Sequence, residues 1–175
     1  KSVTIRTIRV SRSATVPHRG RLWVGPVSVP CALGRSGLTR RKREGDGATP
    51  VGSLAVLGGF YRPDRLPRPT AAMAMRATRP DDGWCDAPGD RLYNRPVRRP
   101  YSASCETLWR EDGLYDVVVD LAWNRGPIRP GRGSAIFLHM ARPGFQPTEG
   151  CVALAPADLR RLLPRLGRRT RLVIG

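Results

Sequence analysis

Short runs of alternating or continuous apolar residues dominate the chain and predict a fold built mostly from β-strands. Residues 3–10 and 21–30 carry β-branched apolar residues in short-range alternation, interrupted by polar and Gly-Pro positions, which is typical of edge strands. The longer apolar runs at residues 114–123 and 134–140 predict buried strands, the first of them central in its sheet.

One segment near the C-terminus predicts a helix. Pro156 stands where a first-turn proline belongs, and the chain reaches Gly167 before the pattern stops. The apolar positions between them follow helical spacing: Leu159, Leu162, Leu163 and Leu166. A last strand is expected over residues 170–174. The expected class is mainly β with one clear helix.

Two loop regions stand out between the expected strands. Residues 45–52 contain three Gly and one Pro before the apolar run 53–57, which predicts a tight turn feeding a strand. Residues 61–101 are rich in Pro, Arg and Asp and show no sustained period. A loop of about 40 residues is usually functional or disordered, and its aromatic residues favour a packed lid.

The composition favours one folded unit over residues 1–175. At 40% hydrophobic and 26% charged residues, the chain is too apolar for a disordered tail. Its 19 Gly and 17 Pro exclude a helical bundle. No run approaches the roughly 20 apolar residues of a membrane span, so the chain is expected to cross no membrane.

The net charge of +17 predicts attraction to anionic polymers. Only Lys1 and Lys42 are lysines, so the other 29 of the 31 cationic residues are arginine. A basic nucleic-acid-binding module is therefore one alternative. Such a module would interleave aromatic with basic residues on its strands, whereas Trp23 and Trp123 have mostly apolar or acidic neighbours. Specific nucleic-acid binding is not expected.

The candidate chemistry depends on Cys151 and His139. The four cysteines show no CxxC spacing, so neither a zinc ribbon nor a thioredoxin motif is supported. His139 ends the strand expected at residues 134–140, and Cys151 follows twelve positions later, after a loop rich in Gly and Pro. The chain can thus return and place a thiol beside the imidazole. The alternative is an inert core cysteine and a hydrogen-bonded histidine.

A cysteine beside an imidazole predicts acyl transfer. The thiolate is the nucleophile, and the imidazole takes the thiol proton. Gly150 lets the backbone approach a substrate carbonyl, and amides at this turn are candidates for holding an oxyanion. If Cys151 is the nucleophile, at most one disulfide can form among the other three cysteines, Cys31, Cys85 and Cys105, and the sequence leaves the pair open.

Three motifs resemble the L,D-transpeptidase (YkuD-like) catalytic domain. They are Ile136-Phe137-Leu138-His139, Thr148-Glu149-Gly150-Cys151-Val152 and the turn Thr49-Pro50-Val51-Gly52. The likeness runs from about residue 31 to the end, with residues 1–30 expected as N-terminal edge strands. It implies a β-sandwich-like catalytic domain without metal or other cofactor. Cys151 would be the nucleophile, His139 the general base and Gly150 part of the oxyanion hole.

The resemblance also implies the reaction and its surroundings. The family forms a Cys thioester with a peptidoglycan peptide stem and passes it to an amine, making a 3-3 or an unusual 1-3 cross-link. Water as acceptor would instead give an L,D-carboxypeptidase or endopeptidase. The implied partners are donor and acceptor stems, with a carbapenem as an adduct on Cys151. The implied location is the periplasm or cell envelope of a bacterium.

The motif around Cys151 departs from the family pattern. Glu149 replaces the His before the Gly, Ala153 and Leu154 replace the Asn or Arg that often follows the Cys, and the loop after His139 is short. We expect Glu149 to hold the imidazolium form of His139 and to anchor Arg142. Thr148 is expected to hydrogen-bond across the turn.

Residues that bind the stem carboxylates are sought among the arginines near the cleft. Arg142 lies within the catalytic loop, and Tyr93, Asn94 and Arg95 lie in the long loop expected to form a lid. These residues, with Thr148 and Glu149, are the substrate-binding candidates. For each of them a purely structural role is the alternative.

Overall fold

The computed structural model describes residues 3–175, and strands are its main element. Within these residues nine strands form the largest sheet, in the order β11-β12-β13-β3-β2-β1-β14-β6-β7. Their bounds are Thr7–Arg12 (β1), Arg19–Val24 (β2), Val27–Ala32 (β3), Gly52–Tyr61 (β6), Met75–Ala77 (β7), Val117–Leu121 (β11), Phe137–Met140 (β12), Val152–Leu154 (β13) and Arg171–Ile174 (β14). An additional pairing of β11 with β6 closes the sheet on itself.

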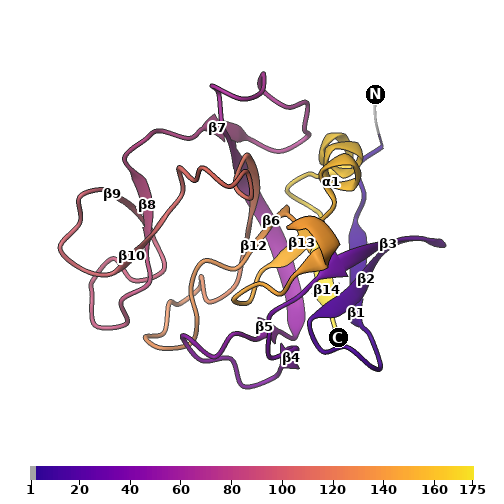
Figure 1. The fold of residues 1–175 in the computed structure, drawn as a ribbon, viewed down its shortest axis with the longest axis horizontal. Helices are drawn as coiled ribbons and strands as arrows, with labels where there is room; N and C mark the ends of the chain where they lie inside the picture. The colour runs from indigo at the N-terminus through magenta and orange to yellow at the C-terminus, as the bar shows by residue number, and fades with distance from the viewer. Residues whose placement is uncertain (1–2) are drawn as a thin grey trace.

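Two smaller sheets complete the strands in the described part of the chain. One has the order β10-β8-β9, and the other pairs β4 with β5. Their bounds are Leu38–Thr39 (β4), Thr49–Pro50 (β5), Asp82–Cys85 (β8), Pro96–Arg98 (β9) and Cys105–Thr107 (β10). The three-stranded sheet lies on one side of the molecule, and the N-terminal strands with the helix lie on the other (Figure 1).

Alternation of side chains explains how the closed sheet holds its core. In β1, Ile8 and Val10 are buried while Thr7 and Arg9 are exposed, and β14 repeats this pattern with Leu172 and Ile174. Because successive side chains of a strand point to opposite faces, the apolar set of each strand enters the enclosed core. The mainly β class expected from the sequence is confirmed.

The single α-helix of the described residues, α1 (Pro156–Leu162), continues into a short 3-10 turn (Leu163–Arg165). Pro156 occupies its first turn, as its fixed φ and missing N–H allow. Leu159, Leu162, Leu163 and Leu166 are buried in the main core, as the helical spacing predicted.

The N-terminal strands are not edge strands, which corrects the expectation for residues 1–30 in their described part. β1 pairs with β2 on one side and with β14 on the other, and β3 pairs with β2 and β13. Strand β14 comes from the far end of the chain, and a local pattern cannot reveal such a long-range pairing.

The segment 61–101 is more regular than the sequence suggested. It holds β7, β8 and β9, and its aromatic residues Trp84 and Tyr93 are buried. Trp84 belongs to a second apolar cluster together with Phe137 and Tyr115. The segment is thus packed, as its aromatic residues indicated. Its strands β8 and β9 belong to the small three-stranded sheet, which forms part of a pocket wall, so the segment is not an irregular loop.

Within residues 3–175, no helix has both the length and the apolar character needed to cross a bilayer.

Candidate active site

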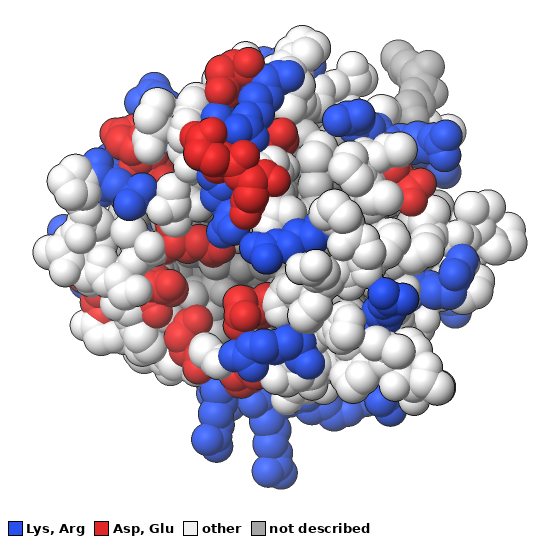
Figure 2. All heavy atoms as spheres, viewed as in Figure 1, with Lys and Arg blue, Asp and Glu red and all other residues white. Residues whose placement is uncertain are grey.

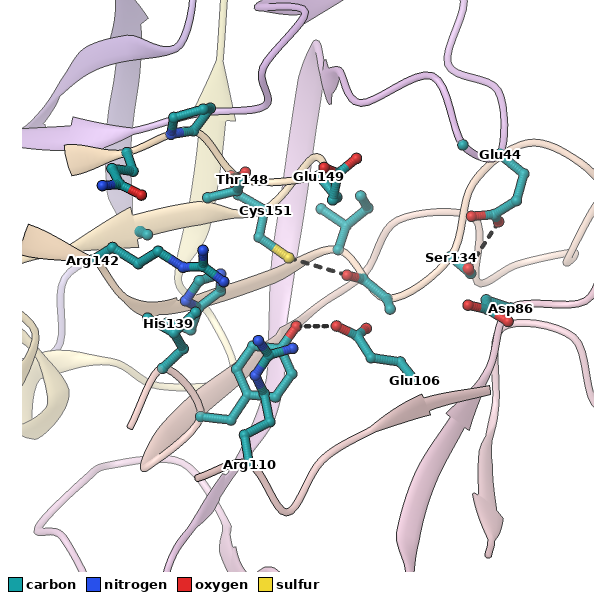
Figure 3. A pocket seen from close by; sticks show the side chains of 18 residues that line it. Glu44, Asp86, Glu106, Arg110, Ser134, His139, Arg142, Thr148, Glu149 and Cys151 are labelled. Atoms are coloured by element: carbon teal, nitrogen blue, oxygen red, sulfur yellow. Dashed lines mark hydrogen bonds between the residues drawn. The ribbon is translucent and has the colours of Figure 1, made fainter. Parts of the chain in front are cut away.

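Two neighbouring strands carry Cys151 and His139 to the same place. β12 and β13 run parallel, with Leu138 opposite Val152 and His139 opposite Ala153. Leu138 and Val152 face the main core. Since side chains alternate along a strand, His139 and Cys151 lie on the other face. Both point into one pocket in Figure 3.

The pocket has a volume of about 430 Å³ and is lined by both charge signs. Its acidic lining residues include Glu44, Asp86 and Glu106, and its basic ones are Arg110 and Arg142. Figure 2 shows acidic side chains gathered around a hollow on this face, although the chain as a whole carries +17.

The Cys151 side chain is a buried, protonated thiol. Its Sγ donates to the Ala135 carbonyl at 3.2 Å and accepts from the Phe137 amide at 3.3 Å. Burial raises the pKa of Cys151 to about 12, and the negative charge of Glu106 acts in the same direction. The Phe137 amide and the charge of Lys42 oppose these effects on the pKa without overcoming them.

His139 is buried and neutral. Its Nδ1 lies 2.8 Å from the Met140 carbonyl. Because a carbonyl only accepts, Nδ1 must carry the proton, and Nε2 is left with a lone pair. Burial lowers the pKa of His139 to about 4. The Tyr115 ring packs edge-on against the imidazole, with ring centroids 5.1 Å apart.

These two groups form a neutral pair in the free protein. Among residues 3–175 no hydrogen bond joins Cys151 to His139, and the thiol donates to Ala135 instead. Burial raises the pKa of Cys151 and lowers that of His139, so the neutral forms are favoured over the expected thiolate and imidazolium in this state. The unprotonated Nε2 is suited to accept a proton once substrate is bound.

The turn before Cys151 is built from Thr148 and Gly150. Thr148 Oγ1 donates to the Cys151 carbonyl at 2.7 Å and accepts from the Gly150 amide at 3.2 Å. Thr148 thus bonds across the turn as the sequence suggested. Gly150 has φ +140°, and a Cβ there would lie 2.9 Å from the Ala48 carbonyl oxygen. The Gly150 amide is held by Thr148, so it is not free to donate into the pocket.

Glu149 interacts with neither His139 nor Arg142, which corrects that expectation. Its carboxylate accepts from Arg35 Nε at 3.1 Å. Arg35 comes from the turn that follows β3, a partner that spacing around residue 149 cannot indicate. Arg142 lies at 3.8 Å from Asp112 and lines the pocket.

The long-loop candidates Tyr93, Asn94 and Arg95 do not line the pocket. Asn94 is buried, and its Oδ1 accepts from the indole N–H of Trp84 at 3.0 Å and from the Ala135 amide at 3.1 Å. The Tyr93 hydroxyl donates to Glu44 and accepts from the Gly133 amide. These two residues support the segment that holds Ala135, the partner of the Cys151 thiol, and Arg95 is exposed.

Glu106 and Tyr115 are among the pocket residues that sequence reasoning missed. Glu106 and Tyr115 line the pocket, and the Tyr115 hydroxyl donates to the Glu106 carboxyl. Burial raises the pKa of Glu106 to about 7. Glu106 comes from β10 and Tyr115 from the turn before β11, and a lone acidic residue in a short strand carries no sequence signal for a place in the pocket. Within residues 3–175, metal-ligating side chains do not gather in groups of three or more.

The sequence matches the L,D-transpeptidase catalytic domain (YkuD) over residues 6–174. The chain belongs to this family. The match therefore includes the interior strands β1 to β3. These strands precede the turn Thr49-Pro50-Val51-Gly52, which is the first motif along the chain that resembles the family. Family membership supports a cysteine-dependent L,D-transpeptidase or a related enzyme.

Among solved structures, the YkuD domain is similar to L,D-transpeptidase 1 of Mycobacterium tuberculosis, with 12% sequence identity and a TM-score of 0.42. The match covers 96% of this chain and 61% of that enzyme's chain, so this chain spans about three fifths of its length. No curated protein matches the sequence.

Proposed function

We propose that this YkuD domain is a peptidoglycan L,D-transpeptidase that forms a thioester between Cys151 and a peptide stem and transfers the stem to an amine. The observation that carries the proposal is the convergence of Cys151 and His139 in one pocket, with the His139 tautomer set by the Met140 carbonyl. That tautomer leaves Nε2 as the proton acceptor that a buried thiol needs.

In the proposed reaction, His139 Nε2 takes the thiol proton while the sulfur attacks the stem carbonyl. The imidazolium then gives this proton to the leaving amine of the D-residue, and the stem remains as a thioester on Cys151. An acceptor amine attacks the thioester, His139 takes the amine proton, and the proton returns to the departing sulfur. Because Cys151 and His139 are both neutral before substrate binds, His139 can act as a general base in the first step.

The acidic wall of the pocket favours an amine over water as the acceptor. Glu44, Asp86 and Glu106 line the same pocket as the thiol. Carboxylates attract an ammonium group and have no comparable effect on neutral water. The acceptor ammonium releases one proton to solvent before the free amine attacks, and His139 takes the second N–H proton during the attack.

Arg142 is the proposed contact for a stem carboxylate. Its side chain is half-exposed at the pocket, and its distance of 3.8 Å from Asp112 leaves the guanidinium loosely held. Thr148 and Glu149 are assigned to the turn and to the ion pair with Arg35. The Thr-Glu-Gly-Cys sequence then describes a divergent form of the motif, in which Arg35 keeps the Glu149 carboxylate paired.

The test is mass spectrometry of muropeptides incubated with the purified protein. We expect a thioester adduct on Cys151 and cross-linked stems, whose fragments distinguish 3-3 from 1-3 bonds. Cys151→Ala should abolish both products, and Cys31→Ala is the control for loss of a buried thiol. Trimmed stems without cross-links would assign an L,D-carboxypeptidase or endopeptidase instead. Full turnover by Cys151→Ala would overturn the proposal.

A carbapenem offers a second readout, since its strained carbonyl acylates the same nucleophile. The expected result is one added carbapenem mass on the peptide that contains Cys151. A cell-envelope location, in the periplasm or at the surface, is proposed from the substrate.

A further inference from the structure

Cys85 and Cys105 lie directly opposite each other in the small sheet. β8 and β10 pair antiparallel, with Cys85 opposite Cys105 and Trp84 opposite Glu106. Side chains of directly opposed residues emerge on the same face of the ladder. Trp84 enters the second apolar cluster and Glu106 lines the pocket, so the two cysteines share the other face.

Backbone hydrogen bonds show whether Cys85 and Cys105 occupy a hydrogen-bonded or a non-hydrogen-bonded position of the ladder. The Asp86 amide donates to the Ser104 carbonyl at 3.2 Å, and the Leu108 amide donates to the Asp82 carbonyl at 3.1 Å. Bonded and non-bonded pairs alternate along an antiparallel ladder. Positions 86 with 104 and 82 with 108 are bonded pairs, so Cys85 with Cys105 is a non-bonded pair.

A non-bonded pair has the spacing of a disulfide. Its Cα atoms lie about 4.5 Å apart, within the range of roughly 4.4–6.8 Å that disulfides span. No other pair of cysteines is opposed in this way in the described sheets: Cys31 faces Gly20 in β2 and Leu154 in β13, and Cys151 lies in the pocket. Both thiols of the opposed pair are free in this structure.

From this register we propose that Cys85 and Cys105 form a cross-strand disulfide that fastens β10 to β8 and so holds Glu106 and Asp86 in the pocket wall. β10 has only three residues and pairs only with β8 in its sheet. In the chain, Asp86 directly follows Cys85, and Glu106 directly follows Cys105. A bond between these strands therefore secures one side of the pocket. This inference stands independently of the proposed transpeptidase activity.

The bond forms by exchange with a small-molecule disulfide such as oxidised glutathione. Cys105 is half-buried and Cys85 is buried, so the Cys105 thiolate attacks first, forms a mixed disulfide and releases one thiol. The Cys85 thiolate then attacks the Cys105 sulfur and releases the second thiol. Two protein thiols are oxidised, one external disulfide is reduced, and both protons end on the released thiols.

Peptide mapping tests the pair directly. The native protein is incubated with oxidised glutathione, denatured, alkylated without reductant and digested with trypsin. Trypsin does not cleave before proline, so Cys85 falls in residues 77–91 and Cys105 in residues 99–110. We expect these two peptides linked, with a mass lower than their sum by two hydrogens, and separated by reductant. Alkylation of both cysteines in the oxidised sample, or linkage to Cys31 or Cys151, would overturn the proposal.

Thermal unfolding gives a second measurement. The bond closes a loop with 19 residues between the cysteines, which should raise the apparent Tm of the oxidised protein by roughly 5–10 °C over the reduced protein. Cys105→Ser should remove this difference, and the control Cys31→Ala should keep it. A redox-dependent shift that persists in Cys105→Ser would contradict the assignment.

Discussion

The Tyr115 hydroxyl donates a hydrogen bond to the Glu106 carboxyl inside the pocket that holds Cys151. The ring of the same tyrosine packs edge-on against His139. One side chain therefore connects the buried acid with the proposed base. Glu106 raises the pKa of Cys151 through its negative charge, so its protonation state affects the nucleophile.

The Glu106→Gln variant should change how stability depends on pH. Burial raises the pKa of Glu106 from 4.5 to about 7, so between these values the folded protein holds a proton that the unfolded chain has released. The stability from this group is full below pH 4.5 and is lost as pH rises through 7. The free-energy difference between wild type and Glu106→Gln should therefore shrink from pH 4.5 to 7, measured by urea unfolding.

His139 acts in the opposite direction over much of this range. Its pKa is lowered from 6.5 to about 4, so its contribution is present above pH 6.5 and is lost as pH falls through 4. Without the Glu106 carboxyl, the gain in stability that His139 gives as pH rises should no longer be offset. Glu149→Gln removes an exposed carboxyl and serves as the charge control. If the difference in unfolding free energy between wild type and Glu106→Gln did not change with pH, this would contradict the raised pKa of Glu106.

In the fully reduced protein at neutral pH, without substrate, thiol reagents should label Cys105 before Cys151. With a pKa of about 12, Cys151 is almost entirely protonated, and alkylation requires the thiolate. Iodoacetamide labelling followed by peptide mass spectrometry measures the order, and the denatured protein provides the reference in which all four thiols are accessible. Preferential labelling of Cys151 would show that a thiolate exists before substrate binds.

Asn94→Ala should destabilise the fold. The Asn94 side chain accepts from Trp84 and Ala135 and donates to the carbonyls of Trp123 and Asn124. Losing these buried partners should cost about 2–4 kcal/mol of unfolding free energy, because unpaired buried groups lose their hydration as well as the bond. Chemical denaturation measures the loss.

The neighbouring Arg95→Ala variant is the control for Asn94→Ala. Arg95 is exposed, and such surface changes usually stay within about 0.5 kcal/mol. Equal effects of the two variants would contradict a structural role for Asn94.

Gly150→Ala should displace Cys151 and lower activity at least about tenfold. The new Cβ would lie 2.9 Å from the Ala48 carbonyl oxygen, at a backbone φ of +140° that side chains rarely adopt. Strain of about 1–3 kcal/mol is expected in the unfolding free energy. Acylation of Cys151 by a carbapenem measures the effect on the nucleophile.

Gly89→Ala is the matched control for Gly150→Ala, because a Cβ at Gly89 meets nothing within 4 Å. In the Gly89→Ala variant, the carbapenem should acylate Cys151 at the wild-type rate. Wild-type acylation by Gly150→Ala as well would show that the turn tolerates a side chain.

The sequence alone predicted the features that depend on local pattern. Continuous apolar runs located the buried strands around residues 117–121 and 137–140, and Pro156 with its following leucines located the helix. The proximity of Cys151 and His139 was also expected, because residues on either side of a short loop can return to the same place, and both line one pocket.

Tertiary structure alone decided which distant side chains meet and how water is excluded from them. Arg35 pairs with Glu149, Asn94 supports Ala135, and Glu106 joins Tyr115 beside the thiol. These partners lie on strands and turns whose pairing spans much of the chain. Burial then changed the chemistry: desolvation keeps Cys151 and His139 neutral, and no local sequence pattern specifies the depth at which a side chain lies.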